Sequence, residues 1–256
     1  MRQETREQLI SLAEKEYKEF SAALVPGEDK MLGVRLPKLR ILAKELAKGN
    51  WGDELVCEDI YFEEIMLRGM IISCVTLKME PEKALPYIRE FIPLVRNWSL
   101  CDSVFMKMDV LQKNPDLTWE FILPYMESGE EFQVRVALIV MMSQLLRIDS
   151  NGKKMSRLRK ITLEHLEKEE EEKSRSGKYL PLILEKINRE YPEGYYAHMA
   201  AAWLVAESFC VFPALTDRFL ETNCLDRATY NKALQKITES KIPDEEVKAY
   251  IRSRKK

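Results

Sequence analysis

Apolar residues recur three and four positions apart along almost the whole chain, which is the spacing of one face of an α-helix. The segment 3–20 shows the pattern clearly, because Leu9, Leu12 and Tyr17 form one apolar stripe with Glu and Lys residues between them. The apolar and polar alternation of strands is nearly absent, and the chain has only nine glycines. The pattern therefore predicts an all-α protein.

Turn and capping residues divide this pattern into separate helices. Pro37 suits the first position of a helix that ends before Gly49. Pro93 closes a later helix, and Asn97 or Ser99 is suited to cap the one that follows. Beyond Gly49 the expected helices span residues 61–79, 81–91, 98–112, 117–126, 132–146, 153–160, 180–187, 195–204, 215–220 and 229–237.

A weak internal repeat is present in the first half of the chain. Arg68, Asp102 and Arg135 follow one another at intervals of 34 and 33 residues, each on the second helix of an expected pair. This is the period of an α-solenoid of HEAT-like units, which stack into a curved ribbon with one concave wall. We expect a single domain over residues 1–256, an α-α superhelix in which inner-helix residues converge on the concave wall.

The formal net charge is -2, but the basic residues are clustered. Two clusters are candidates for phosphate contact, although a solvated helix face would have the same composition. Their candidate residues are Arg35, Lys38, Lys44, Lys153, Arg157 and Arg159. The acidic run 167–172 is expected to be an exposed helix end or loop, and the basic segment 252–256 a frayed tail.

Cysteine usage and the first residues indicate a cytoplasmic protein. The five cysteines are odd in number and have no CxxC spacing, so reduced core thiols are expected. The first ten residues are charged, and no apolar run is long enough to span a bilayer. Neither a metal nor another cofactor is expected, because His165 and His198 lack ligand spacing and no Gly-rich phosphate loop occurs.

The segment 97–102 contains the most suggestive pair of side chains. Trp98 and Asp102 are four residues apart, so they lie on one face of a helix, whose positive end favours a charged Asp102. The alternative is a buried helix start in which Trp98 packs and Asp102 bonds to the main chain. Arg135 is a lone charge in an apolar run, so it pairs with a buried carboxylate or reaches into a cleft; Asp102 is a candidate partner.

Three other residues have both a functional and a structural interpretation. Trp203 ends a stretch of small residues and either projects into a cleft or packs in the core. His198 either contacts phosphate or packs between helices. Glu64 either orients an arginine or is solvated, and we do not count it as catalytic.

Five segments, in this order, resemble the AlkD-like DNA alkylation-repair proteins. They are LGVRLP from residue 32, NWSLCD from 97, an Arg-x-Ala helix at 135, YYAHMAAAW from 195 and NKALQKITES from 231. The resemblance covers nearly the whole chain. It implies a superhelix of HEAT-like repeats whose concave basic face grips double-stranded DNA. In the glycosylase branch it also implies metal-free removal of positively charged alkylated purines, such as 7-methylguanine and 3-methyladenine.

The resemblance also assigns roles to four residues. Trp98 takes the place of the cleft tryptophan, Asp102 of the catalytic carboxylate, Arg135 of the cleft arginine and Trp203 of a second indole. The chemistry fits these residue types, since a cationic purine leaves without a general acid and a fixed carboxylate stabilises the positive charge that develops on the sugar. The predicted function is a monomeric, monofunctional DNA glycosylase of alkylation repair.

Two positions depart from the pattern of the active branch. Ser99 stands where an acidic residue follows the tryptophan, and Val134 where a second arginine precedes Arg135. One alternative is therefore a non-catalytic protein that binds damaged or branched DNA. Another is a helical-repeat scaffold that binds protein, which would have an apolar or acidic concave wall in place of a basic one.

Overall fold

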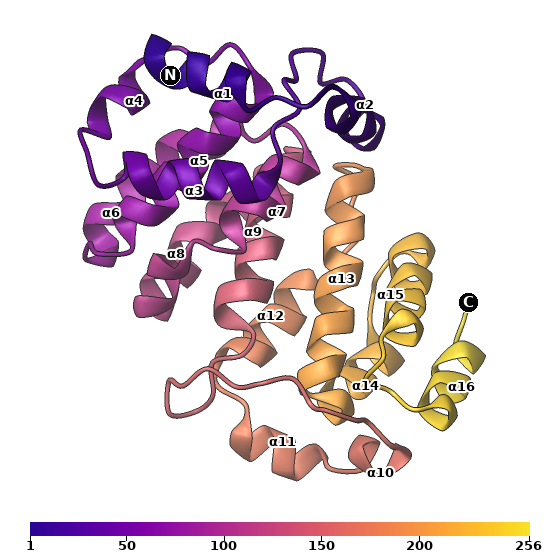
Figure 1. Ribbon diagram of the computed structural model, residues 1–256. Coiled ribbons are helices and arrows are strands. Elements are labelled where there is room, and N and C mark those ends of the chain that lie inside the picture. The colour runs from indigo at the N-terminus through magenta and orange to yellow at the C-terminus, as the bar shows by residue number, and fades with distance from the viewer. The chain divides into compact units, whose positions relative to one another are not determined.

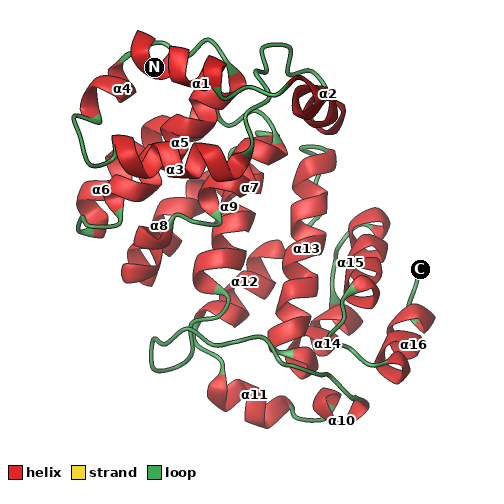
Figure 2. Ribbon diagram, viewed as in Figure 1, coloured by secondary structure: helices red, strands yellow, loops and turns green.

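The computed structural model describes all 256 residues, and its regular structure consists of sixteen α-helices joined by loops and three short helical turns (Figures 1 and 2). The predicted all-α fold class is confirmed. The chain forms two compact units, residues 1–118 and residues 119–256, and the division falls within α8 (Pro115–Met126).

In the first unit, α5 (Phe62–Thr76) is the central helix. It is buried on most of its surface and packs against α3, α6 and α7. The other elements of the unit are α1 (Gln3–Ser11), α2 (Lys15–Leu24), α3 (Leu36–Leu46), α4 (Gly52–Val56), α6 (Pro81–Phe91), the 3-10 turn η1 (Ile92–Leu94), α7 (Trp98–Phe105) and the 3-10 turn η2 (Asp109–Lys113). α5 follows α4, and α7 follows α6 and η1.

The helix predicted over residues 3–20 is wrong, because the chain breaks between α1 and α2. The main-chain N–H of Glu14 donates to the oxygen of Gly33 at 3.0 Å, in place of a bond within one continuous helix. Gly33 has φ +92°, and a Cβ there would lie 2.6 Å from the main-chain oxygen of Glu14 and from the Cβ of Lys18. The break thus accommodates the loop that contains Gly33.

In the second unit, α13 (Tyr195–Val211) is the central helix and packs against α9 and α15. Its alanines at 200–202 are buried, and such small side chains allow close helix packing. The other elements are α9 (Glu131–Val140), the π-helical turn η3 (Met141–Leu145), α10 (Leu163–Leu166), α11 (Glu169–Arg175), α12 (Tyr179–Ile187), α14 (Pro213–Thr222), α15 (Arg227–Glu239) and α16 (Glu245–Ser253).

The basic segment 153–160 is not the helix that we expected. The N–H of Met155 donates to Arg147 at 2.7 Å, and the N–H of Leu158 donates to Cys210 at 3.0 Å. These bonds to distant parts of the chain hold the segment extended. The expectation of a frayed tail is also wrong, since α16 reaches residue 253 and the N–H of Lys256 donates to Asn231 at 3.0 Å.

The acidic run is largely exposed, as predicted, but Glu172 is only 4% exposed. Its carboxylate accepts the N–H of Leu215 at 2.9 Å in the first turn of α14, so α11 is attached to that turn. All five cysteines are free thiols. None of the helices is both long enough and apolar enough to cross a membrane.

Candidate nucleic-acid interface

The start of α7 is fixed by a network of polar contacts within the first unit. Of the two predicted caps, Asn97 is the one that caps the helix: its Oδ1 accepts the N–H of Leu100 at 2.9 Å. The Nδ2 of Asn97 donates to Glu28 at 3.1 Å, and Arg96 pairs with the same carboxylate at 2.7 Å. Glu28, which sequence reasoning missed, therefore ties the loop after α2 to the start of α7.

Trp98 and Asp102 lie one turn apart on α7, and both are partly buried. The indole Nε1 of Trp98 donates to the main-chain oxygen of Leu24 at 3.0 Å, so the last residue of α2 holds this ring. The structure thus brings these two predicted site residues together, on a helix whose position is set by Glu28 and by α2.

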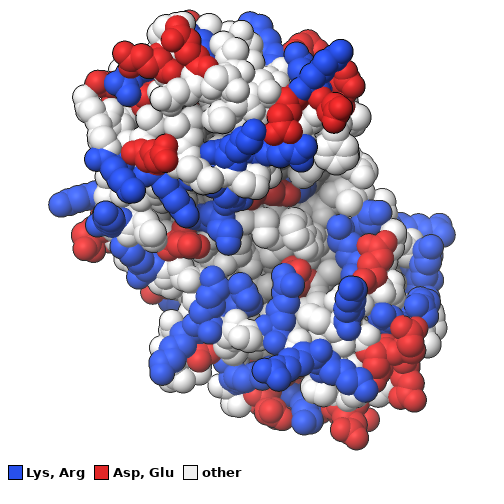
Figure 3. Space-filling view, in the orientation of Figure 1, with Lys and Arg blue, Asp and Glu red and all other residues white.

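A basic hollow of about 350 Å³ lies between α3, α5 and α7, and Ser103, the residue after Asp102, is in its wall. Its cationic residues are Arg40 and Lys44 from α3 and Lys107 from the segment after α7, and they outnumber its one carboxylate, that of Asp109. Figure 3 shows Lys and Arg side chains gathered over α3. Lys44 was among the predicted phosphate contacts, whereas Lys107 was missed because it stands alone in the sequence.

Arg35 and Lys38 form ion pairs with Glu14, at 2.8 and 2.9 Å. The hydrogen bond from Lys38 lowers the pKa of the Glu14 carboxyl below its usual value, and the hydrogen bond from Arg35 adds a smaller effect in the same direction. The guanidinium of Arg35 also lies 4.7 Å from the ring centroid of Tyr17. Both cations are partly exposed, and ion pairs of this kind contribute little stability.

Arg135 belongs to the second unit, where it is only 5% exposed on α9. Its Nη1 donates to the main-chain oxygen of Tyr196 at 2.7 Å, and the carboxylate of Glu131, one turn earlier, accepts the N–H of Tyr196 at 2.6 Å. Gly194, the residue before α13, has φ +146°, and a Cβ there would collide with the Glu131 carboxylate. Arg135 and Glu131 thus position the first turn of α13.

Trp203 is half-buried on α13, two turns beyond Tyr196. Its Nε1 donates to Glu207 at 3.2 Å, and the other carboxylate oxygen of Glu207 pairs with Arg157 at 2.7 Å. The ammonium of Lys236 lies 5.8 Å from the indole centroid. The second unit therefore places Trp203 with two cations, and Glu207 is the connection that sequence reasoning missed.

The remaining predicted phosphate contacts, Lys153 and Arg159, are exposed on the extended segment that also carries Arg157. Figure 3 shows a row of Lys and Arg side chains over this segment. His198 is half-buried on α13, and burial lowers its pKa below the usual value. No group of three or more His, Cys, Asp or Glu side chains is arranged to hold a metal ion.

An all-helical chain with clusters of Lys and Arg in both units, one of them beside Trp203, has features of a nucleic-acid-binding protein. A model of the DNA alkylation repair enzyme family matches residues 5–175, about two-thirds of the sequence. The chain therefore belongs to that family, and the resemblance noted in the sequence is confirmed. No curated protein matches the chain. The family match includes Trp98, Asp102 and Arg135 but ends before Trp203.

Proposed function

We propose that the protein is a monofunctional DNA glycosylase that releases cationic alkylated purines, such as 7-methylguanine and 3-methyladenine, from duplex DNA. The observation that carries the proposal is the pair formed by Trp98 and Asp102 on α7, next to the basic hollow of α3, α5 and α7. Membership in the DNA alkylation repair enzyme family supports the same substrate class.

The reaction needs few protein groups because the alkylated base already carries a positive charge. When the N-glycosidic bond breaks, its electron pair goes to the purine, which leaves as a neutral base, and the sugar becomes an oxocarbenium-like cation. The Asp102 carboxylate is proposed to stabilise that cation and to accept a proton from the water that adds to C1′. The products are a free base and an abasic site.

The cations are proposed to bind the DNA backbone in both units. In the first unit, Arg40, Lys44 and Lys107 surround the hollow, and Trp98 is proposed to stack on the deoxyribose. In the second unit, the buried Arg135 is proposed to act by positioning the first turn of α13, and Trp203, with Arg157 beside it, is proposed to contact the strand. Phosphate contacts of this kind set position and affinity, whereas the charge of the lesion makes it a good leaving group.

The test is release of free 7-methylguanine from methylated duplex DNA, measured by chromatography. We expect release by the wild-type protein and by Asp29→Asn, a matched control at an exposed aspartate of the same unit, but not by Asp102→Asn. Absence of release by a folded wild-type protein that still retains DNA would replace the proposal with a non-catalytic DNA-binding role. Equal loss of DNA affinity and release in Asp102→Asn would make Asp102 structural.

A further inference from the structure

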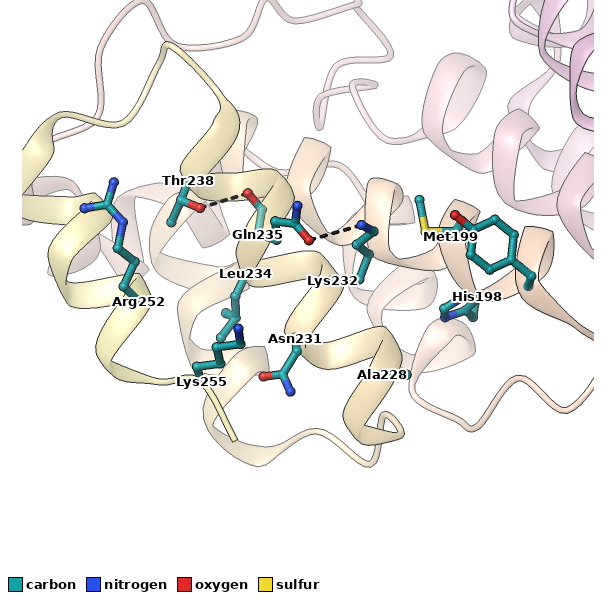
Figure 4. Close-up of a pocket in the computed structure, with 11 residues that line it drawn as sticks. His198, Met199, Ala228, Asn231, Lys232, Leu234, Gln235, Thr238, Arg252 and Lys255 are labelled. Carbon is teal, nitrogen blue, oxygen red and sulfur yellow. Dashed lines mark hydrogen bonds between the residues drawn. The ribbon is translucent and has the colours of Figure 1, made fainter. Parts of the chain in front are cut away.

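A trough of about 380 Å³ lies along the exposed face of α15, between α13 and α16 (Figure 4). Its wall on α15 extends from Ala228 to Thr238, which is about 15 Å along a helix axis. Apart from Ala228 and Lys255, the residues of the trough belong to the segments YYAHMAAAW and NKALQKITES and to α16. All of them lie beyond residue 175, where the family match ends.

The charge of the trough is entirely positive. Lys232, Arg252 and Lys255 line it, and none of the other lining residues is Asp or Glu. Arg252 has only a loose, exposed ion pair with Glu245, at 3.7 Å, which an anion can displace. Figure 4 shows Arg252, on α16, and Lys255, just after that helix, at one side of α15, and His198 at the other side.

Amides on α15 hold the side chain of Lys232 and the main chain next to Lys255. Asn231 donates to the main-chain oxygen of Lys256 and accepts its N–H, at 2.9 and 3.0 Å, which fixes the residue after Lys255 against α15. The ammonium of Lys232 donates to the side chain of Gln235 at 3.1 Å. Lys232 and the main chain next to Lys255 are therefore ordered before a strand binds, which lowers part of the ordering cost of binding there.

One wall of the trough carries an exposed aromatic ring. Tyr195 is 60% exposed, and its ring makes T-shaped contacts with Tyr196 and with His198, each with centroids 5.2 Å apart. These contacts brace a large ring that remains accessible to solvent. A braced, exposed aromatic ring beside a basic groove is the arrangement on which proteins stack unpaired bases.

A second hollow shares Tyr195 and His198 with the trough, but its charge is opposite. It is lined by Glu190 and Asp226, and its volume is about 390 Å³. Carboxylates repel phosphates, so an anionic strand that reaches Tyr195 is directed along α15 and not into this hollow.

We propose that the trough binds a short single-stranded DNA segment, with its phosphates against Lys232, Arg252 and Lys255 and one unpaired base stacked on Tyr195. A duplex keeps its base faces stacked inside the helix, so Tyr195 distinguishes unpaired from paired nucleotides. At about 3.4 Å per stacked nucleotide, the trough takes about four nucleotides. The site includes none of the residues proposed for base release, and it does not depend on that activity.

The test is fluorescence anisotropy with two labelled probes, an eight-nucleotide oligo-dT and an abasic backbone of the same length, using the full chain. We expect Tyr195→Ala to weaken oligo-dT binding about tenfold and to leave the abasic probe unaffected, whereas Tyr195→Phe behaves like the wild type. The double variant Lys232→Gln/Arg252→Gln should weaken both probes and reduce the salt slope by about 1.4, at about 0.7 per single-strand phosphate contact. Lys241→Gln, an exposed lysine outside the trough, is the matched control.

The inference is overturned if the folded wild-type protein does not bind oligo-dT, or if Tyr195→Ala weakens neither probe or both probes equally. The two proposals fail separately. If the wild-type protein releases no base but the oligo-dT results are as expected, only the glycosylase proposal is refuted. Base release that depends on Asp102, with oligo-dT binding that is insensitive to Tyr195, refutes the trough alone.

Discussion

Gly69 lies inside α5 where Phe91 of α6 and Val104 of α7 pack against the helix, and we predict that Gly69→Ala destabilises the first unit. A Cβ at this position would lie 2.5 Å from the Cζ of Phe91 on α6 and 2.7 Å from a methyl carbon of Val104 on α7. Carbon atoms in contact are about 3.5–4.0 Å apart, so both neighbours have to move by about 1 Å. The same displacement shifts α7, which carries Asp102.

The magnitude follows from two opposing effects. Overpacking a well-packed core costs about 1–3 kcal/mol. Replacing Gly with Ala inside a helix returns about 1 kcal/mol through helix propensity. Because the ring of Phe91 and the side chain of Val104 both have to move, we expect an overpacking cost in the upper part of this range. We expect Gly69→Ala to lower the free energy of unfolding by about 1–2 kcal/mol.

The assay is urea denaturation, with Gly52→Ala as the matched control. Gly52 is also helical, at the start of α4, and nothing lies within 4 Å of a Cβ built there. The control should be as stable as the wild type or more stable, because only the propensity effect remains. A Gly69→Ala protein that matches or exceeds the stability of the wild type would refute the packing of α6 and α7 described here.

Two further predictions concern pH and salt. Burial raises the pKa of Glu172 to about 7, so its contribution to stability is present below its unfolded pKa near 4.5 and is lost as the pH rises through 7. Between pH 5 and 8 the free energy of unfolding should therefore fall less in Glu172→Gln than in the wild type, with a difference of at most about 3 kcal/mol. Identical pH dependence of the two proteins would contradict this. Lys44→Gln/Lys107→Gln should reduce the salt slope of duplex DNA binding by about 1.8, with the exposed Lys78→Gln as control. Duplex affinity of the wild type that does not change with salt concentration would exclude binding through phosphate contacts.

Much of the fold follows from local pattern. Helical periodicity with proline and glycine boundaries locates most of the helices, including α6 at the predicted bounds 81–91. The failures arise where distant main-chain groups compete with the local preference. The α1–α2 break depends on Gly33, and the extended segment 153–160 depends on bonds to Arg147 and Cys210. No local pattern reveals such partners.

The candidate site shows the same limit. The spacing of Trp98 and Asp102 predicts a shared helix face, and the structure has them one turn apart on α7. Glu28, which holds the start of that helix, is 69 residues from Asn97 in the sequence. Glu207, which connects Trp203 with Arg157, is an ordinary helical glutamate in the sequence. Spacing identifies groups on one helix, whereas the residues that orient them come from other elements.

The most direct test of the central claim is the single-turnover rate of 7-methylguanine release from duplex DNA, at protein concentrations well above Kd, for the wild type and Asp102→Asn. Saturation removes differences in affinity, so the rate reports the chemical step alone. We predict that Asp102→Asn binds the duplex with wild-type affinity and releases no base above the rate of a control without protein. Release by Asp102→Asn at the wild-type rate would contradict the assignment of Asp102 as the catalytic carboxylate.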